Sequence, residues 1–98
     1  HYNVYLGRTM IKIIQANYLK DKTIQIHFSD GSWGDYNLQP LIDKRSTLTK
    51  EIEDQVDFQK FYLEMGALCW RNGLELGPSS IHHELEQQQR FHHNEIIA

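Results

Sequence analysis

The chain has 98 residues, of which 40% are hydrophobic, so it is long enough for one modest core and too short for two. Charged residues make up 23% of it with both signs interspersed, which excludes the polar, highly charged composition of disordered chains. Ten basic and thirteen acidic residues give a formal net charge of −3, whereas a domain that grips phosphates usually has an excess of Lys and Arg. Direct nucleic-acid binding is therefore disfavoured.

The first half of the chain predicts three strands. Residues 10–18 carry β-branched side chains that nearly alternate with polar ones, which favours a strand with one buried face. Apolar and polar residues alternate strictly over residues 23–29, which predicts a second strand. Asp30 and Gly31 form a turn dipeptide, so a third strand over residues 33–38 should pair with the second as a hairpin.

The middle of the chain is less regular. Pro40 lacks an amide donor and should end the third strand. Residues 43–49 are polar and are expected to form a surface loop. The mixed apolar spacing over residues 48–61 predicts a helical turn or two, followed by an extended run over residues 61–64.

The last third predicts a second hairpin and a helix. Residues 65–66 can turn the chain into the apolar run 67–70, which is of the kind buried in a sheet, and residues 72–73 form another turn dipeptide. Gly77 leads into a helix expected over residues 79–90. Its packed face is expected to consist of Ile81 and Leu85, with Gln88 as a third member.

These elements predict an α+β fold, a small antiparallel sheet built from two hairpins with a C-terminal helix packed on it. We expect Trp70 and Phe28 in its core. Residues 10–90 should form the single domain. Residues 1–9, which precede Met10, are interpreted as an upstream or artificially added extension, and residues 91–98 as a C-terminal tail.

Cysteine usage and hydropathy suggest where the protein works. Cys69 is the single cysteine, so no intramolecular disulfide can form, and its apolar neighbours predict a buried thiol in a reducing compartment. No stretch approaches the roughly 20 apolar residues that cross a bilayer, and no secretory signal pattern opens the chain. We therefore expect a cytoplasmic protein without a membrane partner.

Several segments carry a family resemblance. They are Ile-His-Phe-Ser-Asp-Gly at residues 26–31, Leu-Gln-Pro-Leu-Ile at residues 38–42, Gly-Ala-Leu-Cys-Trp at residues 66–70 and Asn-Gly-Leu-Glu-Leu at residues 72–76. In this order and spacing, over residues 10–86, the chain resembles the family called domain of unknown function 2442.

The resemblance implies a small bacterial α+β domain whose relatives occur alone or joined to a C-terminal helix-turn-helix, some of them beside small toxin-like genes. It implies no catalytic residues. Arg71 replaces a proline that is usual in the family and puts a charge on the turn. Because about eight residues follow Arg90, we expect no helix-turn-helix in this chain.

Six histidines raise the question of a metal site. His82 and Glu86 stand at i and i+4, a spacing that can place two ligands on one metal ion, and His83 is adjacent. However, neighbouring histidines point about 100° apart on a helix, and no further ligand completes a familiar signature. A solvated polar helix face is the simpler interpretation, so we expect no metal or cofactor and keep His82, His83 and Glu86 as weak candidates.

No residue pattern indicates an enzyme. The side chains considered for acid, base or nucleophile roles each have a structural explanation in a turn, on the polar face of a strand or in the core. They are His27, Asp30, Asp35, Glu64, Cys69 and Glu75. We therefore expect no catalytic residue.

Aromatic residues suggest a contact surface instead. Trp and Tyr bring large contact area at little entropic cost, and an exposed Trp33 or Tyr36 beside the turn at Asp30 is the first choice for a partner-binding patch. Arg71 is a further candidate contact. These features favour a non-enzymatic protein-binding module, an antitoxin-like or regulatory member of a bacterial gene pair whose partner is a basic, toxin-like protein.

Two alternatives and one assembly question stay open. A nucleic-acid-associated transcriptional regulator without its own helix-turn-helix would need its basic residues to gather on one side, and a small metal-binding protein would use the histidines. The basic residues considered are Arg8, Lys12, Lys20, Lys22, Lys44, Arg45 and Lys50. Phe91, Ile96 and Ile97 fit a homodimer, through the terminal helix or the edge of the first strand, and a frayed tail equally well.

Overall fold

Two antiparallel sheets and a C-terminal helix make up the part of the chain that the structure, a computed structural model, describes, which is residues 11–88 and 91–93. The strands of the larger sheet lie in the order β1 (Ile13–Lys20), β2 (Thr23–Phe28), β3 (Ser32–Asn37) and β7 (Phe91–His93). The smaller sheet contains β4 (Tyr62–Glu64), β5 (Ala67–Cys69) and β6 (Glu75–Leu76). Helix α4 (Pro78–Gln87) follows β6, so the expected antiparallel α+β class is confirmed.

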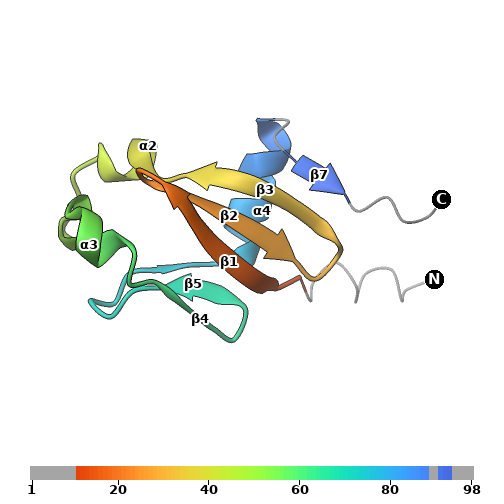
Figure 1. Cartoon of the computed structure of the whole chain (residues 1–98), viewed down its shortest axis with the longest axis horizontal. Helices are drawn as coiled ribbons and strands as arrows, with labels where there is room; N and C mark the ends of the chain where they lie inside the picture. The colour runs from red at the N-terminus through yellow and green to blue at the C-terminus, as the bar shows by residue number, and fades with distance from the viewer. Residues whose placement is uncertain (1–10, 89–90, 94–98) are drawn as a thin grey trace.

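Four short helical segments connect β3 to the smaller sheet. They are α2 (Gln39–Ile42), η1 (Thr47–Thr49), η2 (Glu51–Glu53) and α3 (Gln55–Phe58). Helices α2 and α3 lie at the end of the molecule farthest from β7 (Figure 1). The helical turns expected in this region are confirmed, but residues 43–49 are not a plain loop, because they include η1 and bury Thr49.

The β2–β3 hairpin forms as the sequence predicts. Asp30 Oδ1 accepts hydrogen bonds from the backbone N–H and the hydroxyl of Ser32, at 2.9 and 2.6 Å, which closes the turn. Gly31 has a φ of +92°, which a residue with a Cβ rarely adopts. This turn sets the register that places His27 directly opposite Trp33.

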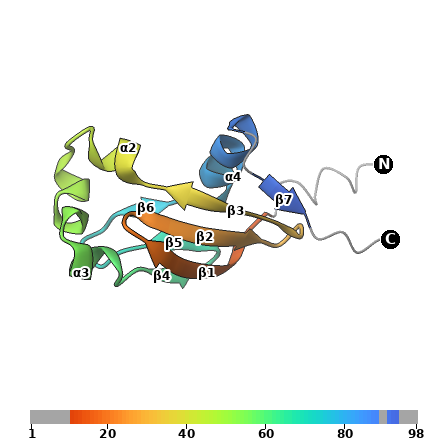
Figure 2. The same ribbon diagram turned by 45° about the horizontal axis from the view of Figure 1, so that its top comes forward.

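The core lies where the two sheets and α4 meet. The smaller sheet packs beside β1, and α4 packs against β3 (Figure 2). Phe28 and Trp70 are 1% and 4% exposed, so both aromatic residues expected in the core are buried. The buried apolar core consists of Ile13, Ile24, Ile26, Phe28, Tyr36, Leu38, Ile42, Ile52, Phe58, Leu68, Trp70, Leu74, Ile81 and Leu85.

The structure also corrects several expectations. The second predicted hairpin, β4–β5, belongs to a separate sheet. Residues 91–93, placed in the tail by the sequence, form β7 and pair with β3. Helix α4 ends at Gln87, and Gln88 is exposed rather than packed. Residues 1–9, with Arg8, and the pair Ile96 and Ile97 lie outside the described residues.

Lys22 departs from the expected set of surface cations, because it is 8% exposed. Its Nζ donates to the backbone carbonyl of Glu53 at 3.0 Å and to Oε1 of Gln55 at 2.7 Å, and it lies 5.2 Å from the ring centroid of Phe58. Gln55 in turn donates to the hydroxyl of Tyr18 at 2.6 Å. These bonds satisfy a buried charge and attach η2 and α3 to the turn between β1 and β2.

Of the described helices, none combines the length and apolar character that a bilayer-spanning segment needs.

Candidate functional site

One face of the larger sheet is turned away from the core, and we call it the outer face. On β2 the buried Ile24, Ile26 and Phe28 alternate with less buried residues, and successive side chains of a strand point to opposite faces. The pairing of β1, β3 and β7 with their neighbours extends this face across the sheet. Its residues are Gln15, Asn17, Lys20, Thr23, Gln25, His27, Trp33, Asp35, Asn37 and His92.

A stack of three rings crosses the outer face. Trp33 pairs with His27 on one side and with His92 on the other, so the register of three strands brings the rings together. The ring centroids of His27 and Trp33 are 5.7 Å apart with an interplanar angle of 18°. Those of Trp33 and His92 are 4.3 Å apart with an angle of 23°. Both faces of the indole are therefore covered by imidazole rings.

Hydrogen-bonding groups lie beside this stack. The imidazole Nε2 of His27 is 2.9 Å from Oε1 of Gln25, which is the residue opposite Asp35. Oδ1 of Asp35 is buried and has no hydrogen-bond partner within the described part of the chain. An unpaired buried carboxylate oxygen costs free energy, so a hydrogen-bond donor supplied by a bound partner would be stabilised here.

Apolar residues border the outer face along β1. Ile14 is 63% exposed and lies at an irregularity in the β1–β2 register, beside Gln15. Leu19, at the second irregularity, is 42% exposed. The outer face thus combines aromatic, amide and apolar groups, a mixture that is common at protein interfaces.

The four partner-binding candidates from the sequence do not come together. Trp33 lies on the outer face and is partly exposed. The expectation that Tyr36 is exposed is wrong, because its side chain points to the core and is 8% exposed. Burial, with the Glu84 carboxylate nearby, raises the pKa of the Tyr36 phenol far above its ordinary value. Tyr36 therefore stabilises the fold and offers no surface for a partner.

Asp30 is held by the fold as well. Besides its bonds to Ser32, its Oδ2 lies 3.0 Å from Nε2 of His82 on α4. The His82 ring also packs edge-on against Phe28, with centroids 4.9 Å apart. The pair joins the β2–β3 turn to α4. Arg71 lies elsewhere, in the exposed turn between β5 and β6.

The weak metal candidates do not converge. His82 is engaged with Asp30, while His83 and Glu86 are exposed on α4. Within residues 11–88 and 91–93, no three His, Cys, Asp or Glu side chains are placed to hold one metal ion. Cys69 is 6% exposed, and burial, together with the carboxylates of Glu75 and Glu64, raises the pKa of its thiol. A thiol held in its neutral form is a poor nucleophile.

The two histidines that stack on Trp33 were not named as partner-binding residues from the sequence. His27 could have been found, since a three-residue loop over residues 29–31 places it opposite Trp33. His92 could not, because nothing local indicates that β7 returns to β3.

Comparison of the chain with family models, with curated proteins and with solved structures finds no match.

Proposed function

We propose that the protein is a non-enzymatic protein-binding module that contacts its partner through the outer face of the larger sheet. The observation that supports this most directly is the His27–Trp33–His92 stack, a large ring surface on the side of the sheet opposite the core. Stacked rings held by strand pairing are rigid before binding, so little conformational entropy is lost when a partner covers them. The exposed Ile14 and Leu19 extend the contact area along β1.

The chemistry of this face favours a protein partner over nucleic acid. The charges of its two formally charged residues, Lys20 and Asp35, cancel, whereas a surface that binds a phosphate backbone needs a surplus of positive charge. Bases commonly stack on exposed aromatic rings, but both faces of Trp33 are already occupied by histidines. Lys22, one of the cations considered for a basic surface, is buried.

The biological role that we propose is that of an antitoxin-like or regulatory member of a bacterial gene pair. Two features support it. The net charge of −3 suits a basic partner, and the resemblance to the domain of unknown function 2442 implies relatives that lie beside toxin-like genes.

The test is a binding measurement between the purified chain and the product of the adjacent gene. Trp33→Ala removes the centre of the stack, and Gln15→Arg adds a bulky charge to the outer face without touching the rings. Both should weaken binding, while Leu48→Ala, which trims an exposed apolar residue on η1, should not. Absence of any interaction for the unaltered chain would rule out this role, and full binding by both outer-face variants would rule out the surface.

A further inference from the structure

An open cleft of about 520 Å³ lies between the η2–α3 segment and the smaller sheet. Its aromatic residues are Tyr62 on β4 and Trp70 at the end of β5. Charged residues complete the lining, namely Glu51, Asp57, Lys60 and Arg71. The volume is within the range of sites that hold small molecules. The cleft is formed by elements other than the strands of the outer face.

Two hydrogen bonds fix the walls of the cleft relative to each other. The indole N–H of Trp70 donates to the backbone carbonyl of Phe58 on α3 at 2.9 Å. The side-chain amide of Asn72 donates to the carbonyl of Leu48 at 2.9 Å, while its Oδ1 accepts from the N–H of Leu74 at 3.1 Å. The turn that carries Arg71 is therefore attached to η1, which directly precedes the η2 segment that carries Glu51. A site whose walls are held in this way needs little reorganisation on binding.

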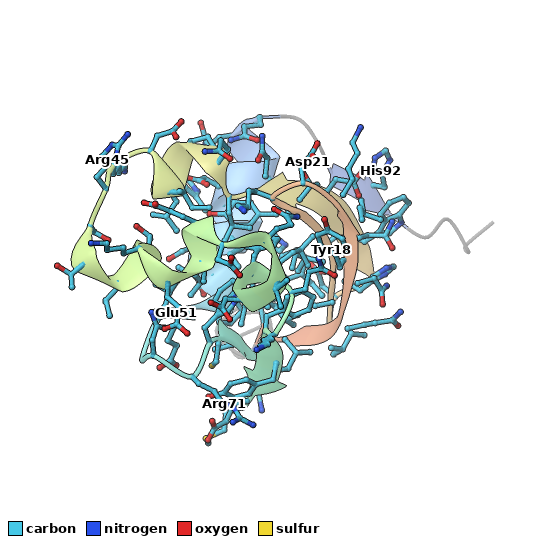
Figure 3. The ribbon with its side chains drawn as sticks, turned by 60° about the vertical axis from the view of Figure 1, so that its left-hand side comes forward. Tyr18, Asp21, Arg45, Glu51, Arg71 and His92 are labelled. Carbon is cyan, nitrogen blue, oxygen red and sulfur yellow. The ribbon has the colours of Figure 1, made fainter. Side chains whose placement is uncertain are left out.

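Two of the four charged side chains in the cleft form an ion pair with each other, and the other two do not. Lys60 Nζ lies 3.5 Å from Oδ1 of Asp57, so these two charges neutralise each other. The Glu51 and Arg71 side chains form no ion pair or hydrogen bond within the described residues. Figure 3 shows them on different segments, Glu51 on the helical stretch and Arg71 on the turn beyond β5. Glu51 and Arg71, unpaired within the described residues, thus line a cleft whose exposed aromatic side chain is Tyr62, with the buried Trp70 behind it.

We propose that this cleft binds a small zwitterionic ligand, an α-amino acid with an apolar or aromatic side chain. Arg71 would accept the carboxylate, since a guanidinium pairs with a carboxylate through two parallel hydrogen bonds. Glu51 would accept hydrogen bonds from the ammonium group, and the ligand's side chain would lie against Tyr62 and the small exposed part of Trp70. A ligand that lacks either charge leaves Arg71 or Glu51 without its partner and therefore binds more weakly. This site is independent of the partner surface on the larger sheet.

The test uses the complete chain labelled with ¹⁵N and follows the indole N–H resonance of Trp70 during titration with L-phenylalanine. Two analogues each lack one charge, N-acetyl-L-phenylalanine without the ammonium and L-phenylalaninamide without the carboxylate. We expect the Trp70 resonance to shift with phenylalanine, and both analogues to bind at least about tenfold more weakly.

Variants assign each charge to its residue. Arg71→Ala should weaken the binding of phenylalanine at least about tenfold and leave the binding of phenylalaninamide, which has no carboxylate, nearly unchanged. Glu51→Gln should also weaken the binding of phenylalanine at least about tenfold, but it should leave the binding of the N-acetyl analogue, which has no ammonium group, nearly unchanged. Arg45→Ala removes an exposed arginine outside the cleft and is the matched control. A Trp70 resonance that does not move, equal affinity for all three probes, or an equal effect of Arg45→Ala would each overturn the proposal.

Discussion

The indole N–H of Trp70 donates a 2.9 Å hydrogen bond to the backbone carbonyl of Phe58 and so joins the end of β5 to the last residue of α3. The centroids of the two rings lie 5.9 Å apart, and Phe61 packs edge-on against Trp70 with ring centroids 6.1 Å apart. Because Phe58 is fully buried, its position couples α3 to the core. One polar bond and two ring contacts therefore hold the smaller sheet against the helical segment.

Substitutions at Trp70 should separate these contributions. Trp70→Ala creates a cavity in the core and should lower the free energy of unfolding by about 3–5 kcal/mol. Trp70→Phe keeps most of the ring but leaves the Phe58 carbonyl without its donor, which should cost about 1–3 kcal/mol. Urea unfolding measures both values. A Trp70→Ala protein that unfolds at the same urea concentration as the parent would contradict the assigned core.

The β2–β3 hairpin shows what could be predicted from the sequence. Its signals are local, since a turn dipeptide stands between two alternating runs, and the structure reproduces the pairing. The same alternation also contains information about Tyr36 that the sequence interpretation did not use. Trp33 and Tyr36 are three positions apart on one strand, so they point to opposite faces, and only one of them can join an exposed patch.

What could not be predicted depends on contacts between distant segments. The pairing of β7 with β3 joins residues far apart in the chain, and no dipeptide or periodicity marks it. The same holds for Lys22, whose burial depends on a carbonyl of η2 and the amide of Gln55. The cleft was also missed, because Glu51 and Arg71 become neighbours of one cavity only after the turn at Asn72 is tied to Leu48.

Acid should weaken the fold through Asp30. Burial tends to raise the pKa of this carboxyl, but hydrogen bonds from Ser32 and His82 outweigh it, and the pKa lies below the ordinary value of 3.8. Because the folded-state pKa is depressed, the stabilisation is present above pH 3.8 and is lost as the pH falls through the folded pKa. Asp30→Asn should remove this part of the pH dependence.

Thermal unfolding of both proteins, from neutral pH to below the ordinary aspartate pKa, checks the prediction. The difference in melting temperature between the parent and Asp30→Asn should shrink as the solution becomes more acidic. Asp43→Asn, at an exposed aspartate, serves as the control for adding an amide. A difference that stays constant across the range would contradict the role assigned to the Asp30 carboxylate.

Two glycines in turns allow backbone strain to be distinguished from a steric clash. Gly66 and Gly73 have φ values of +83° and +103°, so alanine is strained at both positions, by about 1–2 kcal/mol. A Cβ at Gly66 would also lie 2.7 Å from Cβ of Lys12, whereas nothing lies within 4 Å at Gly73. Gly66→Ala should therefore destabilise the protein more than Gly73→Ala. If urea unfolding shows that both variants lose the same free energy of unfolding, then the Lys12 side chain moves aside without cost.

The stack on the outer face should hold β7 to the sheet. β7 has three residues and lies at an edge, so its pairing with β3 gains support from the contact between Trp33 and His92. Trp33→Ala should therefore accelerate amide hydrogen exchange in β7 while β2 stays protected, because β2 is held by strands on both sides.

Proton NMR offers a second readout of the same variant. The imidazole protons of His27 and His92 lie over the indole of Trp33 and should be shifted by its ring current. In Trp33→Ala both sets of signals should move toward the values of unstacked histidine, whereas Trp70→Phe, an aromatic change in the core, should leave them in place. If His27 moves and His92 does not, then the His92 ring does not lie on the indole of Trp33, and the stack cannot support β7.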